Sequence, residues 1–250
     1  MTLAETLADL RHQTGAGRHA ETGLWVSGVL RDRIAAGQLP PGTKLSEEPL
    51  REALGVSRNT LREAFSTLSA ERMVTRIPNR GVFVARPTAD DIREIYRVRR
   101  YLEPAALAFT MADEASEPIL DRLRQVVDSS RAARTAGSIR GMADANQDFH
   151  AGIVALAGSE RLNRLMVQVL AEMRLVFHSM AEDEHFHAPY VDDNARIVEL
   201  LAAGRQSDAA ELLTAYLRRA EAQLLSALAE PGREPLPTEV LRRRGNYGTR

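Results

Sequence analysis

The stretch LGVSRNTLREAF, residues 54–65 of this 250-residue chain, decides the fold of its N-terminal part. Gly55 ends one helical pattern, and Ser57 stands where an N-cap would begin the next helix, because its hydroxyl can accept a hydrogen bond from a free amide of the first turn. The apolar residues of that next helix recur on one face, at Leu61, Ala64, Phe65 and Leu68. Two helices joined by so short a turn predict a helix-turn-helix.

Upstream residues supply the other helices of a small domain. Apolar residues at helical spacing predict a helix over residues 24–36, which Gly37 ends. Ser46 is placed to cap a short helix over residues 47–54. Together with the helix that begins after Ser57, these segments predict a core of three helices.

A β-hairpin follows the helices. Residues 74–77 and 82–84 are rich in β-branched and aromatic side chains, and they flank the turn sequence Pro78-Asn79-Arg80-Gly81. A helix-turn-helix followed by a hairpin predicts a winged helix-turn-helix domain over residues 21–86. Residues 1–20 lack sustained periodicity and are expected to form a flexible tail.

After Pro87 the sequence predicts helices only. Thr88 is an N-cap with Asp91 at the position of a capping box, and apolar residues then recur at helical spacing. Breaks rich in Gly, Pro and Ser divide residues 87–230 into about six helices of about 15–25 residues, which is typical of an antiparallel bundle. Residues 231–250 are expected to be a basic tail. The predicted fold class is mainly α: a winged helix-turn-helix of three helices plus a β-hairpin wing, followed by an all-α antiparallel helical bundle.

Composition excludes several classes of protein. The chain has 44% hydrophobic and 27% charged residues, as a globular protein does, and it contains no cysteine for disulfides or thiolate chemistry. No stretch has the about 20 apolar residues of a membrane span, and the first residues do not resemble a secretion signal. We therefore expect a cytoplasmic protein.

The net charge of −1 conceals an uneven distribution. Residues 21–86 carry ten Arg and Lys against seven Asp and Glu, a surplus of three positive charges. Residues 87–230 carry sixteen against twenty-three, a surplus of seven negative charges. A basic domain joined to an acidic one favours a function in which the N-terminal domain contacts a polyanion.

The second helix of the helix-turn-helix carries side chains suited to base recognition. Arg58 and Arg62 are four residues apart and share one face, with Asn59 and Thr60 beside them. An arginine in this position can donate two hydrogen bonds to guanine in the major groove. Two alternatives stay open, because Arg62 could pair with a neighbouring carboxylate and Arg58 could simply be solvated.

The hairpin tip offers a second contact with a polyanion. Arg80 could reach a phosphate or the minor groove, and Gly81 would allow close approach of the backbone. The alternative is that these residues serve only to form the turn.

Three segments resemble the GntR family of bacterial transcription regulators. They are IAAGQLPPGTKL at residues 34–45, LGVSRNTLREA at residues 54–64 and PNRGVFV at residues 78–84. The resemblance implies that the protein binds a palindromic double-stranded DNA operator as a homodimer. It also implies the DNA-binding residues Lys44, Ser57, Arg58, Asn59, Thr60, Arg62, Arg80 and Gly81.

The helical part resembles the FCD subfamily of these regulators, through IYRVRRYLE at residues 95–103 and DFH at residues 148–150. That resemblance implies a small organic acid as effector, bound within the bundle, and a regulator that we expect to be a repressor. Many members also hold a divalent metal with one Asp and three His. The matching positions in this sequence are Asn146, His150, Asn194 and Tyr216.

Only His150 keeps its ligand type among those four positions, so we expect no metal cofactor. Amides, an imidazole and a phenol could still bind an acid through hydrogen bonds, with an arginine as charge anchor. The expected effector site is Arg99, Asn146, His150, Asn194 and Tyr216. Alternatives stay open, because Arg99 could pair with Glu103 on a solvated face and His150 could be a core histidine.

The remaining histidines and aromatic residues are expected to be structural. His178, His185 and His187 surround an acidic run at residues 182–184, which favours a solvated loop over residues 180–189, with a metal site as the alternative. The aromatic residues expected in the core are Trp25, Phe109, Phe149 and Phe177.

An alternative of a different class is a metal-dependent enzyme built on the helical bundle. A ferritin-like di-iron site needs Glu-x-x-His pairs on two helices, and the pair Glu182 and His185 has no copy on a second helix. The chain has no phosphate-binding loop, nucleophile elbow or dinucleotide fingerprint, so we predict no catalytic residues. A third alternative, sequence-independent DNA binding of an architectural type, would require a larger basic surplus than this N-terminal domain carries.

Overall fold

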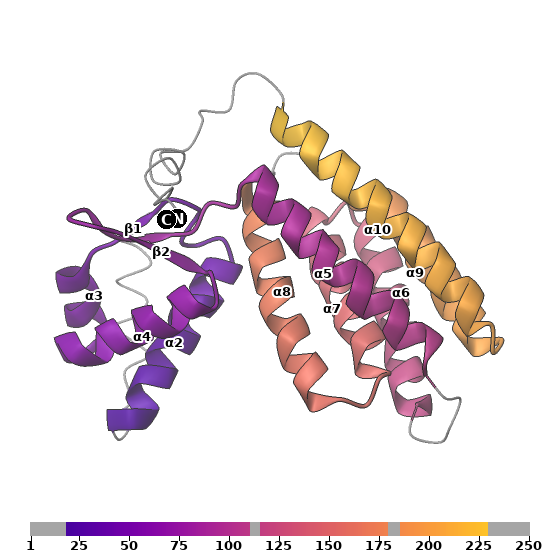
Figure 1. The fold of residues 1–250 in the computed structure, drawn as a ribbon, viewed down its shortest axis with the longest axis horizontal. Coiled ribbons are helices and arrows are strands. Elements are labelled where there is room, and N and C mark those ends of the chain that lie inside the picture. The colour runs from indigo at the N-terminus through magenta and orange to yellow at the C-terminus, as the bar shows by residue number, and fades with distance from the viewer. Residues whose placement is uncertain (1–18, 111–115, 180–185, 230–250) are drawn as a thin grey trace, which may run out of the picture.

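The computed structural model describes residues 19–110, 116–179 and 186–229, which form an N-terminal domain and a helical bundle (Figure 1). The helices of the N-terminal domain are α2 (His19–Ala35), α3 (Glu47–Leu54) and α4 (Arg58–Ala70), as predicted. Helix α2 begins earlier than the apolar pattern over residues 24–36 indicated. Apart from the first residues of α2, the predicted tails at residues 1–20 and 231–250 lie outside the described residues.

The apolar faces of these helices and the sheet make the core of the N-terminal domain. Leu30 and Ile34 of α2 pack there with Leu61 and Phe65 of α4, and all four are fully buried. The helix-turn-helix prediction is therefore confirmed. Ser46 takes the N-cap position of α3, but its side chain makes no capping hydrogen bond, so that expected contact is wrong.

A three-stranded sheet forms the wing, where the sequence predicted a hairpin of two strands. Strand β3 (Gly81–Val84) lies between β1 (Lys44–Leu45) and β2 (Val74–Ile77), and both pairings are antiparallel. A strand as short as β1 shows no alternation in the sequence. The turn before β3 places Asn79 at φ +60° and Gly81 at φ +111°, which Asn and Gly adopt more readily than other residues.

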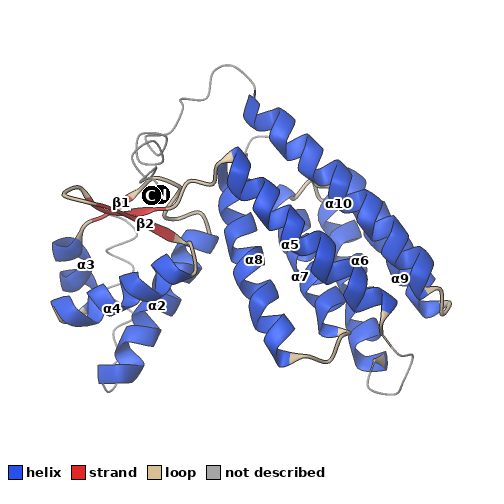
Figure 2. Cartoon of the chain, viewed as in Figure 1, coloured by secondary structure: helices blue, strands red, loops and turns tan. Residues whose placement is uncertain are grey.

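The bundle contains only helices in the part of the chain that the structure describes (Figure 2). The capping box predicted at its start is present, because Thr88 Oγ1 accepts from the Asp91 amide at 3.2 Å and the Asp91 carboxylate accepts from the Thr88 amide at 2.8 Å. Among the described residues, no helix has the length and apolarity needed to cross a membrane. The bundle helices are α5 (Ala89–Ala108), α6 (Glu117–Thr135), α7 (Ile139–Ala155), α8 (Glu160–Ser179), α9 (Ala188–Ala202) and α10 (Gln206–Ala229).

Two expectations about side chains of the bundle are wrong. Phe109, expected in the core, is 84% exposed at the end of α5. His187, expected in a solvated loop, is 5% exposed, whereas His185 lies outside the described residues. Phe149 is fully buried, and both Trp25 and Phe177 pack against the cores as expected.

Helices α2 and α8 join the two domains (Figure 1). His178 Nε2 of α8 donates a hydrogen bond to the carbonyl oxygen of Ala35 at 2.7 Å, and Leu175 of α8 is buried in the core of the N-terminal domain. Gly37 has φ +74°, and a Cβ at this position would lie 3.0 Å from His178 Cε1. Glycine is therefore required here both by the backbone conformation and by the close approach of the ring.

Candidate DNA interface and effector site

The N-terminal end of α4 is fixed by its own cap. Ser57 Oγ accepts a hydrogen bond from the Thr60 amide at 3.1 Å and lies 2.8 Å from Thr60 Oγ1. Thr60 is only 6% exposed, whereas Ser57 and Asn59 are exposed. The structure thus gives Thr60 a part in the helix start, and the DNA contact that the family resemblance implied for it stays a prediction.

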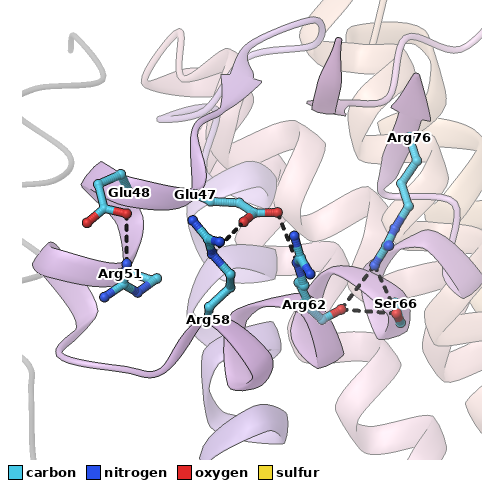
Figure 3. A network of polar contacts seen from close by, with 7 residues as sticks. All are labelled: Glu47, Glu48, Arg51, Arg58, Arg62, Ser66 and Arg76. Carbon is cyan, nitrogen blue, oxygen red and sulfur yellow. Dashed lines mark hydrogen bonds and ion pairs between the residues drawn. The ribbon is translucent and has the colours of Figure 1, made fainter. Parts of the chain in front are cut away.

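Arg58 and Arg62 lie on one exposed face of α4, and both side chains point to Glu47 at the start of α3 (Figure 3). Arg58 Nε lies 3.5 Å from Glu47 Oε2, and Arg62 Nε lies 3.3 Å from Glu47 Oε1. The arginine side chains are 58% and 55% exposed, respectively. Because exposed ion pairs contribute only about 0–1 kcal/mol, an anionic ligand can replace Glu47 at small cost.

Arg76 of β2 attaches the wing to α4, and the sequence did not indicate this residue. Its Nη2 donates hydrogen bonds to the Arg62 carbonyl oxygen at 3.0 Å and to Ser66 Oγ at 2.9 Å (Figure 3). These contacts hold the strand against the same turn of α4 that presents Arg62. The wing and the exposed face of α4 therefore keep a fixed relation to each other.

The wing carries two exposed cations near its tip. Lys44 of β1 pairs with Phe83 of β3, and a Cβ built on Gly81 would lie 3.5 Å from Lys44 Cε. Arg80 is exposed in the turn, and its amide donates to the Ile77 carbonyl oxygen at 3.0 Å. Cations on a loop beside a recognition helix can bind phosphates without reading bases.

A buried polar network lies inside the bundle, and it includes all five residues of the expected effector site. Every member is at most 7% exposed, although the members come from four helices. We call it the bundle network; its members are Arg99 and Glu103 of α5, Asn146 and His150 of α7, Asn194 of α9 and Tyr216 of α10.

Hydrogen bonds connect the bundle network without interruption. Arg99 Nε donates to Glu103 Oε1 at 2.6 Å, and His150 Nδ1 lies 2.6 Å from Glu103 Oε2. On the other side of the ring, the hydroxyl oxygen of Tyr216 lies 3.1 Å from His150 Nε2 and 2.8 Å from Asn146 Oδ1. The pair of Arg99 and Glu103 is buried, although the sequence also allowed it on a solvated face.

Burial and neighbouring charges set the protonation of these groups. Burial alone raises the pKa of Glu103, but Arg99 and His150 oppose it and hold that pKa below its usual range. Burial lowers the pKa of His150, with Glu103 opposing and Arg99 assisting, and burial raises the pKa of Tyr216 well above its usual range. Since the Glu103 carboxylate can only accept a hydrogen bond, the proton of neutral His150 is on Nδ1. His150 Nε2 and Asn146 Oδ1 are then alternative acceptors for the single proton of the Tyr216 hydroxyl.

Two atoms of the bundle network have no hydrogen-bond partner among the described residues. They are Arg99 Nη2, a donor, and Asn194 Oδ1, an acceptor. The amide nitrogen of Asn194 is used, because it donates to Asn146 Oδ1 at 3.1 Å. Buried polar atoms without a partner are rare in proteins, and a bound molecule is one common explanation.

The chemistry of the bundle network does not suit a borderline divalent metal. Its one imidazole is engaged on both nitrogens, by Glu103 and by Tyr216, and the Tyr216 phenol keeps its proton. Asn146 Oδ1 already accepts from the Asn194 amide and lies 2.8 Å from the Tyr216 hydroxyl. Across the described residues, no cluster of three or more His, Cys, Asp or Glu side chains is arranged to hold a metal ion.

Sequence reasoning missed three residues of these sites. Glu47 lies in the predicted helix over residues 47–54 and Arg76 in a predicted strand, and the sequence pattern indicated no further role for either. Glu103 was considered a surface partner of Arg99, although it is the central acceptor of the bundle network. The spacing of four residues between Arg99 and Glu103 was the available signal, but spacing alone does not show which face is buried.

Both domains match known protein families. Residues 25–84 match the profile of bacterial regulatory proteins of the gntR family. Residues 94–219, which cover most of the bundle, match the FCD domain. The two matches fall on the winged helix-turn-helix and on the helices that carry the bundle network, respectively.

Individual proteins agree with these matches. The chain is 32% identical over 132 residues to an HTH-type transcriptional regulator in the TAR-I ttuE-ttuC′ intergenic region of Agrobacterium vitis, covering 52% of this chain and 77% of that protein. It is 40% identical over 84 residues to the gluconate operon transcriptional repressor of Bacillus licheniformis, covering 34% of each chain.

A solved structure extends the similarity to the whole fold. A GntR transcriptional regulator from Rhodococcus sp. RHA1 is 41% identical with a TM-score of 0.75, covering 82% of this chain and 98% of that one. The winged domain, the bundle and their order along the chain are thus shared. The chain belongs to the GntR family of bacterial regulatory proteins, in the branch with an FCD domain, and is a DNA-binding transcriptional regulator.

Proposed function

We propose that the protein is a repressor that binds a palindromic operator with α4 in the major groove and the wing on phosphates. The observation that carries this proposal is the pair of exposed arginines, Arg58 and Arg62, on one face at the N-terminal end of α4. Recognition helices present that end to the bases. The similarity of the N-terminal part to a gluconate operon repressor supports repression rather than activation.

A homodimer follows from the reach of one recognition helix. A single helix reads only a few base pairs, so two copies related by a two-fold axis read half-sites about 10 base pairs apart. We place this activity in the cytoplasm, where bacterial DNA is found. We assign the protein no catalytic reaction, because the gntR family match and the similar proteins are transcriptional regulators.

We further propose that a small organic acid binds at the bundle network without a metal and changes operator affinity. The unpartnered donor Arg99 Nη2 and acceptor Asn194 Oδ1 support this, because a carboxylate can accept from the first and a hydroxyl can donate to the second. Tyr216 and His150 would adjust their shared hydrogen bond around such a ligand. A hydroxy acid is therefore the effector class that the donors and acceptors fit best.

Operator binding is tested by selecting duplexes from a random pool with the full-length protein and measuring affinity by fluorescence anisotropy. Arg62→Ala should weaken binding to the selected duplex by about 1–3 kcal/mol and weaken binding to a scrambled duplex much less. Arg93→Ala is a matched control, because Arg93 is exposed to a similar degree, 52%, but lies on α5. Equal losses on both duplexes would mean that Arg62 contacts only phosphate, and failure to select any duplex would refute the function.

A further inference from the structure

A pocket of about 300 Å³ lies where the end of α2 meets α7 and α8. We call it the junction pocket. It is separate from the bundle network, since neither Arg99 nor His150 lines it. Its lining includes Ala35 and Ala36 of the N-terminal domain and Ala143 of α7. Its volume is at the lower end of the range for small-molecule sites, which favours a small ligand.

The walls of the junction pocket are held in place by specific contacts. His178, which also lines it, is bonded to the Ala35 carbonyl oxygen at 2.7 Å. Arg174 Nη1 lies 2.5 Å from Asp144 Oδ1, so α8 and α7 are joined beside the pocket. A ligand in this pocket would therefore contact residues of both domains.

The polar lining of the junction pocket favours an anion. Gln147 is 5% exposed, and its Nε2 has no hydrogen-bond partner among the described residues. The lining contains two arginines, Arg140 and Arg174, and one carboxylate, Asp144. Its net charge is therefore one positive charge when the histidines are counted as neutral. Asp144 is shared between the two arginines, at 2.5 Å from Arg174 and 3.8 Å from Arg140. A buried amide donor beside surplus positive charge is an arrangement that a carboxylate satisfies.

The apolar lining favours an anion that carries a flat apolar group. Phe177, Phe186 and His187 form an aromatic group, with the Phe177 and His187 ring centroids 4.8 Å apart and those of Phe186 and His187 5.0 Å apart. Phe186 and His187 are buried, at 4% and 5% exposed. Phe177 is only partly buried, so it can offer ring surface to a further ring, while Phe186 and His187 support it from behind.

We propose that the junction pocket is a second ligand site, which binds a small carboxylate with a flat apolar body. Gln147 Nε2 donates to the carboxylate, the surplus guanidinium charge attracts it, and the aromatic group holds the apolar part. The site goes beyond the effector site at the bundle network, because its ligand contacts α2 directly. Occupancy would restrain the N-terminal domain against α8.

The test uses isothermal titration calorimetry of the full-length protein with benzoate and phenylacetate as probes and benzamide as the neutral control. At least one acid should bind, and benzoate should bind at least about 10-fold more tightly than benzamide. Gln147→Leu should weaken benzoate by about 10-fold or more, because one hydrogen bond to a charged group is lost. Gln168→Leu, the same change at an exposed position of α8, should leave affinity unchanged.

A second variant and a local measurement keep the outcome clear if Gln147→Leu folds poorly. Ala143→Leu should fill the pocket and abolish binding, since Ala143 is only partly buried and can be enlarged. Benzoate should also slow hydrogen exchange of residues 35–38, whose amides include Gly37, bonded to the Ile34 carbonyl at 3.0 Å. Failure of both acids to bind at millimolar concentration would overturn the proposal. Acid binding that survives both pocket variants, or protection confined to α10, would also overturn it.

Discussion

Replacing Glu103 with glutamine removes the one anion of the bundle network while nearly keeping its shape. The carboxylate is completely buried and lies 2.6 Å from both Arg99 Nε and His150 Nδ1. Without it, the Arg99 guanidinium stays 2% exposed with no counter-charge. Removing one partner of a buried ion pair costs about 3–5 kcal/mol, so Glu103→Gln should lower the free energy of unfolding by that amount.

The same substitution elsewhere on α5 supplies a matched control. Glu94 pairs with Arg97 one turn along the helix, but its side chain is 54% exposed. Glu94→Gln should change the free energy of unfolding by only about 0–1 kcal/mol. The contrast isolates burial, since both positions carry the same residue in a helical ion pair with an arginine.

Urea unfolding followed by far-UV circular dichroism measures both variants. Protein concentration must be fixed, because the stability of a dimer depends on it, and the urea slope should stay unchanged. The double variant Arg99→Met with Glu103→Gln should recover part of the loss, because no uncompensated charge remains. If Glu103→Gln costs less than about 1 kcal/mol, or no more than Glu94→Gln, the buried ion pair does not exist as described.

Four further outcomes are expected. Arg80→Ala should weaken binding to all duplexes alike and reduce the slope of log affinity against log salt by about one, measured by anisotropy at several salt concentrations. Tyr216→Phe should weaken binding of the organic-acid effector in calorimetry and leave operator binding by the free protein intact. Equal effector affinity in the wild type and the variant would mean that the effector binds elsewhere. Protein purified without chelator should contain far less than one Zn, Ni, Mn or Fe per chain by elemental analysis, and stoichiometric metal would contradict the metal-free site. Because burial lowers the pKa of His150, the unfolded chain takes up a proton first below about pH 6.5, so urea midpoints should fall with decreasing pH, and less steeply in His150→Gln.

Local signals explain how much of the fold the sequence predicts. The capping box of Thr88 and Asp91 and the reversal at Gly55 depend only on neighbouring residues, and both occur where expected. Strand β1 could not be predicted, because its pairing with β3 joins residues 37 and 39 positions apart and it is too short to show a pattern. Phe109 was placed in the core by periodicity, but it lies past the last residue of α5, where the periodicity no longer determines direction.

The candidate sites show the same division between local and distant information. The shared face of Arg58 and Arg62 follows from helical spacing, but their common partner Glu47 belongs to another helix. The meeting of His150 with Tyr216 from α10 came from the family resemblance and not from spacing. The burial of Glu103 also needed the packed bundle, because an arginine four residues away is compatible with either face of a helix.

The contact of Glu47 with both arginines bears on how long the protein stays on the wrong DNA. At the proposed DNA interface, a duplex that takes both guanidinium groups away from Glu47 loses these two contacts, and that cost is the same for every sequence. Only a duplex that presents guanines in the right register compensates for this cost, through bidentate hydrogen bonds to the arginines. A genome offers about 10⁶–10⁹ competing sites. Even a small uniform penalty therefore shortens the residence time on non-operator DNA and leaves more molecules available to search for the operator.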